Sequence, residues 1–174
     1  MKALVVYESM FGNTEQVARA IADGLRESVE TESVEVSEAP KVPGPDVGLI
    51  VAGGPTHAFS MSRASTRADA ITRGAQEGEQ DFGLREWMDG LPSGHHTEKV
   101  ATFDTRIQTM RHLPGSAAKG AAKEARRHGY ESAEPAESFY VHDVDGPLLD
   151  GELDRARAWG RQLGAALGGS TAGR

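Results

Sequence analysis

A cluster of hydroxyl, amide and glycine residues follows the first apolar segment of the chain. Ser9, Gly12, Asn13 and Thr14 stand directly before a segment of helical periodicity. Hydroxyl groups and backbone N–H groups at the start of a helix can bind a phosphate without a lysine, and a glycine allows close backbone approach. The loop has neither the lysine of a P-loop nor the three glycines of a dinucleotide-binding turn. It therefore predicts a phosphate site of another kind, or residues that only cap the helix.

Two more groups of chemically capable residues follow later apolar segments. Residues 53–59 combine two glycines with Pro55, Thr56 and His57, whose imidazole can donate a hydrogen bond or carry a proton near neutral pH. Residues 102–106 place Asp104 and Arg106 after a fourth apolar segment. His57 could instead be a loop histidine in solvent, and Arg106 could pair with Asp104 at the surface.

The elements that must position these residues alternate between strands and helices. Short apolar or alternating segments predict strands at residues 3–7, 33–37, 47–52, 99–103 and 138–144. Helical periodicity or composition predicts helices at residues 13–26, 61–75, 84–91, 116–128 and 152–167. This alternation indicates an α/β fold, an open parallel sheet with helices on both faces. Ligands of such sheets bind beyond the carboxyl ends of the strands, so the loops after strands one, three and four are the candidate site.

Length and composition set limits on the class of protein. The 174 residues fit one domain over residues 1–167, followed by a flexible tail at 168–174. The chain has no cysteine, which excludes disulfides, thiolate metal sites and dithiol redox chemistry, so that redox activity would need a bound cofactor. A net charge of -7 disfavours nucleic acid and anionic membranes. With no signal-peptide pattern and no long apolar run, we expect a cytoplasmic protein.

The phosphate-like loop also resembles a known family. Residues 7–15, Tyr-Glu-Ser-Met-Phe-Gly-Asn-Thr-Glu, are similar to the loop with which flavodoxins wrap the phosphate of FMN, and residues 53–59 resemble their Gly-x-Pro-Thr-x-x loop over the flavin ring. The resemblance implies a five-stranded sheet in the order 2-1-3-4-5, one bound FMN and electron transfer. It implies a cofactor site made of Ser9, Met10, Phe11, Gly12, Asn13, Thr14, Pro55, Thr56, His57, Ala58, Phe59, Phe103, Asp104, Thr105 and Arg106.

The chain departs from the flavodoxin pattern at several positions. Flavodoxins usually stack Trp and Tyr on the flavin, whereas His57 and Phe59 are the candidates here. Phe11 stands where many flavodoxins have a hydroxyl residue. The match after the fourth strand is weak, but Arg106 there could stabilise negative charge on a reduced flavin, which Asp104 would oppose.

Several functions remain open at this stage. The first is an electron carrier that exchanges electrons with redox partner proteins, as a monomer or weak dimer, with no catalytic residue of its own. The second is an FMN-dependent NAD(P)H reductase acting on a quinone or similar acceptor, and the third a flavin-free binding module of the same fold. Arg63, Arg67 and Arg73 could meet a pyridine nucleotide phosphate or an acidic partner, although a solvated helix face is the simpler interpretation. The adjacent His95 and His96 are not expected to bind a metal, and residues 143–147 predict a turn.

Overall fold

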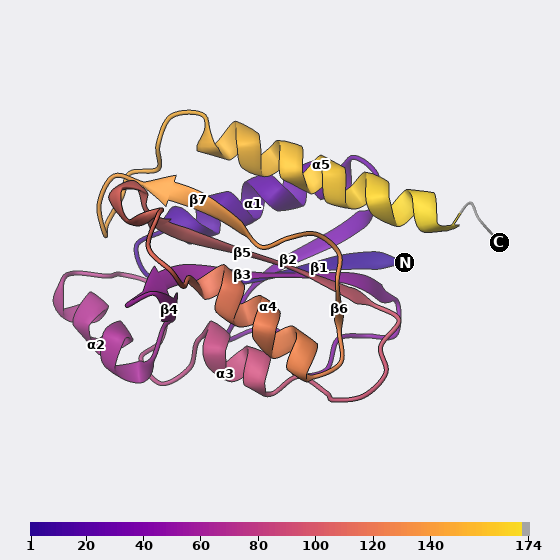
Figure 1. Ribbon diagram of the computed structural model, residues 1–174, viewed down its shortest axis with the longest axis horizontal. Coiled ribbons are helices and arrows are strands. Elements are labelled where there is room, and N and C mark those ends of the chain that lie inside the picture. The colour runs from indigo at the N-terminus through magenta and orange to yellow at the C-terminus, as the bar shows by residue number, and fades with distance from the viewer. Residues whose placement is uncertain (172–174) are drawn as a thin grey trace.

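A computed structural model describes residues 1–171 of the chain as a parallel sheet between two layers of helices (Figure 1). The strand order is β2-β1-β3-β5, and β5 then pairs with β6 and β7 in turn along its length. The strands are β1 (Lys2–Tyr7), β2 (Glu30–Glu35), β3 (Val47–His57), β4 (Ser60–Met61), β5 (Lys99–Ile107), β6 (Glu131–Ser132) and β7 (Glu137–Val141). All main pairs are parallel, and only β4 pairs with β3 in the antiparallel sense.

The helices cover the sheet unequally. They are α1 (Asn13–Arg26), α2 (Ala64–Thr72), α3 (Leu84–Asp89), α4 (Ala117–Arg127) and α5 (Glu152–Thr171), with a short 3-10 helix η1 (Gln108–Met110) after β5. In Figure 1, α1 and α5 lie over one face, whereas α2, α3 and α4 lie on the other side. Within residues 1–171, no helix combines the length and apolar character that crossing a bilayer requires.

Each face of the sheet has its own hydrophobic core. Successive side chains of a strand point to opposite faces, so β1 sends Val5 toward α1 and α5, and its neighbours Leu4 and Val6 toward α3 and α4. Both cores are fully enclosed, which explains why the central strands are almost wholly apolar. The predicted three-layer α/β fold is confirmed.

The predicted sheet differs from the observed one in its details. The predicted order 2-1-3-4-5 describes the five long strands β2, β1, β3, β5 and β7, but the two-residue strands β4 and β6 are too short to show in the sequence pattern. The second strand begins at Glu30 rather than residue 33, because Glu30 pairs in register with Lys2. The last helix covers residues 168–171 of the predicted tail, and residues 172–174 lie outside the described part of the chain.

Two strands continue through segments predicted as loops, and these corrections shape the site. Strand β3 runs on through the glycines to His57. Only glycine fits at position 53, because a Cβ atom there would lie 2.3 Å from the ring of Phe103. Strand β5 likewise continues through Asp104 and Arg106 to Ile107, held by its pairing with β7. The predicted end at residue 103 is therefore wrong. The polar residues here favour a loop in the sequence pattern, whereas Asp104 and Arg106 are buried in the strand and only some of their polar atoms make hydrogen bonds.

Candidate functional site

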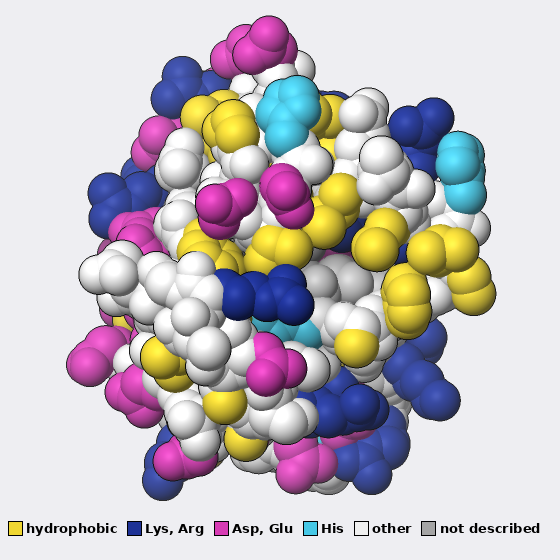
Figure 2. All heavy atoms as spheres, turned by 90° about the vertical axis from the view of Figure 1, so that its left-hand side faces the viewer, with side chains coloured by type: hydrophobic (Ala, Val, Ile, Leu, Met, Phe, Trp, Pro, Cys, Tyr) yellow, Lys and Arg dark blue, Asp and Glu magenta, His cyan; other side chains and the backbone are white. Residues whose placement is uncertain are grey.

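Two adjoining cavities open at the carboxyl ends of the strands. The larger is about 310 Å³ and lies among β3, α2, β5 and η1; the smaller is about 60 Å³ and lies against the loop after β1. Both are lined by Thr56, His57, Arg106, Ile107 and Val144, so they form one continuous site. Figure 2 shows this end of the molecule, where apolar side chains gather across the middle among charged groups. The larger cavity alone is within the range of small-molecule pockets.

The smaller cavity lies at the N-terminus of α1. Gly12 adopts a left-handed φ of 89° directly before the helix, a conformation that a side chain would strain. The hydroxyl oxygen of Ser9 accepts hydrogen bonds from the N–H groups of Gly12 and Glu15, at 3.1 and 3.3 Å. The N–H groups of Asn13 and Thr14 in the same turn make no hydrogen bond within the described chain, and they are available to a ligand. The loop therefore combines a helix cap with an anion site.

Polar side chains of distant segments complete this smaller cavity. The hydroxyls of Thr14 and Thr105 are 2.7 Å apart and hydrogen-bonded, which ties α1 to the end of β5. The side chain of Asn13 packs against Gly146, on the loop after β7. Met10, Phe11 and Pro55 supply apolar surface alongside.

A tight hairpin forms one wall of the larger cavity. Strands β3 and β4 are joined by Ala58 and Phe59, and both have positive φ, 47° and 65°. Hairpins with two left-handed residues normally use Asn and Gly, so these residues hold backbone strain at the site. The turn leaves the Phe59 side chain 47% exposed at the cavity rim, where an aromatic ring can contact a bound ligand.

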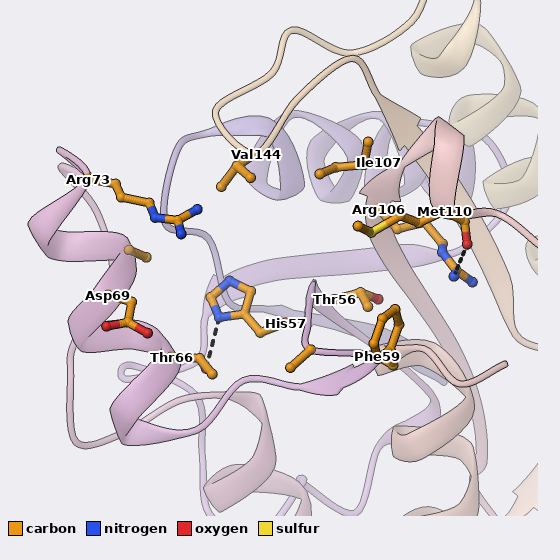
Figure 3. A pocket seen from close by; sticks show the side chains of 12 residues that line it. Thr56, His57, Phe59, Thr66, Asp69, Arg73, Arg106, Ile107, Met110 and Val144 are labelled. Atoms are coloured by element: carbon orange, nitrogen blue, oxygen red, sulfur yellow. Dashed lines mark hydrogen bonds between the residues drawn. The ribbon is translucent and has the colours of Figure 1, made fainter. Parts of the chain in front are cut away.

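His57 lies in the middle of the larger cavity as a neutral imidazole. Its Nδ1 is 3.1 Å from the hydroxyl oxygen of Thr66 on α2, a hydrogen bond drawn in Figure 3. Burial, and next the positive charge of Arg67, lower the pKa of His57 from 6.5 to about 4. At neutral pH the ring is uncharged and can pack against a flat apolar ligand. The predicted alternative of a loop histidine in solvent does not fit this position.

Arg106 lies on the opposite wall, and it is only 6% exposed. One terminal nitrogen of its guanidinium donates to the carbonyl oxygens of Met110 and Leu113, at 2.6 and 3.4 Å (Figure 3). Its Nε is buried without a hydrogen-bond partner. The predicted alternative of a surface pair with Asp104 is wrong, because both residues are buried. Arg106 instead brings a positive charge and an unused donor to the cavity wall.

Two of the predicted site residues lie away from the cavities. The ring of Phe103 is fully buried and meets Phe139 and Trp159 edge to face in the core beneath α5. Asp104 is fully buried on the other face, where its carboxylate accepts from the N–H of Ala118, and burial raises its pKa. Phe103 was predicted as the last residue of a strand and Asp104 as part of the loop after it, but both belong to β5, so their side chains alternate between the two cores.

The arginines of α2 have two different environments that the sequence did not reveal. Arg67 is fully buried and donates to Ser62 and Glu86, with a Glu8 carboxylate oxygen 3.8 Å away. Burial raises the pKa of Glu8 despite its hydrogen bonds from Ser62 and the Leu84 N–H. The predicted solvated helix face is therefore wrong for Arg67.

Arg73, directly after the last residue of α2, lines the cavity. Figure 3 shows it extending toward His57. Ile107 and Met110, from the long segment after β5, also line the cavity. The lining residues that were not predicted are Thr66, Asp69, Ala70, Val141 and Val144. Val141 is the last residue of β7 and Val144 lies in the loop after it, at the same edge of the sheet. The rule that ligands bind beyond the carboxyl ends of parallel strands would have found these two valines.

An acidic segment lies across the phosphate-like loop. The N–H of Glu77 donates to the carbonyl oxygen of Met10 at 3.2 Å. A carboxylate oxygen of Glu77 lies 3.5 Å from the position that a Cβ atom on Gly12 would occupy. Glu77 is exposed, but its position brings a negative charge close to the anion site.

Comparison with known proteins agrees with this geometry. The sequence profile of the flavodoxin family matches residues 5–65, and a search of curated proteins found no match to the chain. Among solved structures, an archaeal flavodoxin is similar at 20% identity and a TM-score of 0.64, over 95% of this chain and 97% of that one.

Two further solved structures show the same arrangement. Oxidised flavodoxin 2 from Bacillus cereus aligns at 18% identity and a TM-score of 0.63, over 95% of this chain and 99% of that one. The flavodiiron protein from Giardia intestinalis aligns at 19% identity and a TM-score of 0.60, over 95% of this chain but 36% of that one. The strand order and the likeness to these structures show that the chain has a flavodoxin-like fold, and the family match covers its first loops.

Proposed function

We propose that this protein binds one FMN in the two adjoining cavities and transfers electrons through it. The observation that carries the proposal is the continuity of an anion site at the N-terminus of α1 with a larger, mostly apolar cavity beyond Thr56 and His57. FMN has the same two parts, a phosphate and a flat ring system. The unpartnered Nε of Arg106 adds a donor where a polar edge of the ring would need one.

The smaller cavity would hold the phosphate. The free N–H groups of Asn13 and Thr14 and the Thr14 hydroxyl supply donors, and the helix dipole adds a favourable field. Charge-assisted hydrogen bonds contribute about 1.5–3 kcal/mol each, so two of them exceed about 3 kcal/mol. At 1.4 kcal/mol per factor of ten, this corresponds to a preference of about a hundredfold for FMN over riboflavin.

The larger cavity would hold the ring. His57, neutral at pH 7, and Phe59 offer flat surfaces, and Met110 and Val144 cover the sides. FMN supplies the redox chemistry when it is bound, and the protein's part is to orient it, to limit water and to set the local charge. No nucleophile or dithiol is then required of the chain, and electrons would pass to and from partner proteins at the exposed rim.

The test is a titration of the apoprotein with FMN, riboflavin and FAD while flavin fluorescence is followed. We expect FMN to bind at least about a hundredfold more tightly than riboflavin, and FAD to bind weakly because no second anion site receives its adenylate. Thr14→Val should reduce the FMN preference, whereas Thr72→Val, which changes an exposed hydroxyl on α2, should not. Equal affinities for FMN and riboflavin would show that the first loop is only a helix cap. Bound FMN that dithionite does not reduce would exclude electron transfer.

One observation supports a second candidate, an FMN-dependent NAD(P)H reductase. Arg73 lines the cavity, and no hydrogen bond or ion pair of its side chain occurs among the described contacts, so it could receive a nucleotide phosphate. Oxidation of NADPH by the FMN-loaded protein, followed at 340 nm, separates the two candidates. An Arg73→Gln variant with a raised KM for NADPH and unchanged FMN binding would favour the reductase.

A further inference from the structure

A second cluster of ligating side chains lies on the side of the molecule formed by α3 and α4, outside the cavities described above. Asp89 is the last residue of α3, while Glu124 and His128 lie one turn apart at the end of α4. One ligand atom from each residue lies within 4.8 Å of the other two. Two carboxylates and an imidazole from two helices therefore converge on one point.

His128 is held with its second nitrogen unused. The residue is 8% exposed, and its Nδ1 is hydrogen-bonded to the hydroxyl of Ser93 at 2.7 Å. Its Nε2 is buried without a hydrogen-bond partner, although a carboxylate oxygen of Glu124 is 3.2 Å away. A hydrogen bond to one ring nitrogen that orients the other is the usual arrangement behind a metal-binding histidine. Nε2 and the carboxylate oxygen of Glu124 are close enough to bind one ion together.

The local charge also favours a cation. The C-terminal end of α4 carries the negative end of the helix dipole, and two carboxylates lie beside it. Arg127, whose side chain is 64% exposed, pairs with Asp89 and Glu124 from outside. One guanidinium for two carboxylates leaves a net negative charge.

We propose that Asp89, Glu124 and His128 bind a divalent transition-metal ion of the zinc class, with Arg127 as the internal cation that it displaces. Imidazole nitrogen together with carboxylate oxygens is a ligand set that zinc accepts, at about 2.0–2.2 Å from each atom. Such lengths require ligand atoms roughly 3.4 Å apart. Asp89 is the residue that moves, because its side chain is 70% exposed. Water fills the remaining positions, and the bound ion links the ends of α3 and α4.

The test is calorimetric titration of the full chain, carrying no added histidine tag, with zinc chloride. We expect one bound ion per chain and at least a tenfold loss of affinity in His128→Ala and in Glu124→Gln. Arg127→Ala should raise the affinity, because the competing cation is gone. Ser93→Ala should lower it by about tenfold if Ser93 positions the ring. His112→Ala is the matched control, since that exposed histidine lies on the loop after η1 and should bind zinc like the natural chain.

Three outcomes would overturn the proposal. If neither the natural chain nor Arg127→Ala binds zinc, the site does not exist. If only Arg127→Ala binds zinc, Arg127 keeps the site closed in this protein. Equal binding by the natural chain and His128→Ala places the ion elsewhere. Should His128→Ala fail to fold by circular dichroism, Glu124→Gln decides, since Glu124 is partly exposed. A cobalt-loaded sample gives a second readout, because its visible spectrum reports nitrogen and oxygen ligation.

Discussion

Arg106 should raise the reduction potential of bound FMN, and this effect follows from its burial. The prediction rests on the FMN site proposed above. The side chain is 6% exposed and lines both cavities, so its charge acts on a ligand with little screening by water. Reduction adds negative charge to the ring, and a guanidinium beside the ring favours that charge.

The size of the effect can be worked out from the burial of the charge. Two unit charges about 5 Å apart interact by about 1.5–3 kcal/mol at an effective dielectric constant of about 20–40. For a two-electron midpoint, about 1.4 kcal/mol corresponds to 30 mV. Arg106→Gln, which keeps a donor for the carbonyls of Met110 and Leu113 but removes the charge, should therefore lower the two-electron midpoint by about 30–60 mV.

Spectroelectrochemical titration of the FMN-loaded variants checks this prediction. Arg106→Lys keeps the charge and should stay close to the natural potential. Arg111→Gln removes an exposed charge five residues further along and is the control for a general charge effect. A midpoint for Arg106→Gln within about 10 mV of the natural value, with FMN still bound, would refute the reasoning.

Three further predictions concern the residues around the site. Because the folded state holds His57 at a pKa of about 4 instead of 6.5, it binds fewer protons than the unfolded state, and stability falls as pH drops from 6.5 to 4. In urea titrations across this pH range, the free energy of unfolding of His57→Gln should fall by about 2 kcal/mol less than that of the natural chain. An unchanged dependence of the free energy of unfolding on pH would contradict the assignment. Arg67→Met should cost about 3–5 kcal/mol in the same assay by leaving buried Glu8 without a cation, and a loss below about 1 kcal/mol would refute the role of Arg67. Glu77→Gln should tighten FMN binding several-fold at low salt without changing riboflavin binding, as fluorescence titration would show; an equal change for both flavins would rule out an effect on the phosphate.

Parts of the fold and site could be predicted because their patterns are local. The apolar strands and the helix after Gly12 are set by residues close together in sequence, so periodicity found them. The short strands β4 and β6 have no such pattern. The continuation of β5 through Asp104 and Arg106 was missed for a related reason, since the strand that pairs with these residues, β7, comes much later in the sequence.

The same limit explains what was missed at the site. Thr14 and Thr105 were both predicted as site residues, but the hydrogen bond between them joins positions 91 residues apart and has no local pattern. The sequence predicts the same solvated face for Arg67 and Arg73, and only the packing of Glu8 and Glu86 around α2 decides that Arg67 is buried. Val144 enters the cavity through a loop that the sequence shows only as a turn.

The walls of the site also bear on how the chain folds. Residues 10–14, 55–57, 105–107 and 141–144 meet at one end of the sheet. Each paired residue of the central strand β1 has its partner on β3 45 or 46 positions later in the chain. Chains whose native pairs are distant in sequence fold slowly, because each closure costs entropy before any contact forms. The smaller cavity is complete only when β7 has joined the sheet. FMN should therefore leave the folding rate unchanged and slow unfolding, since no early species contains a surface that it can bind.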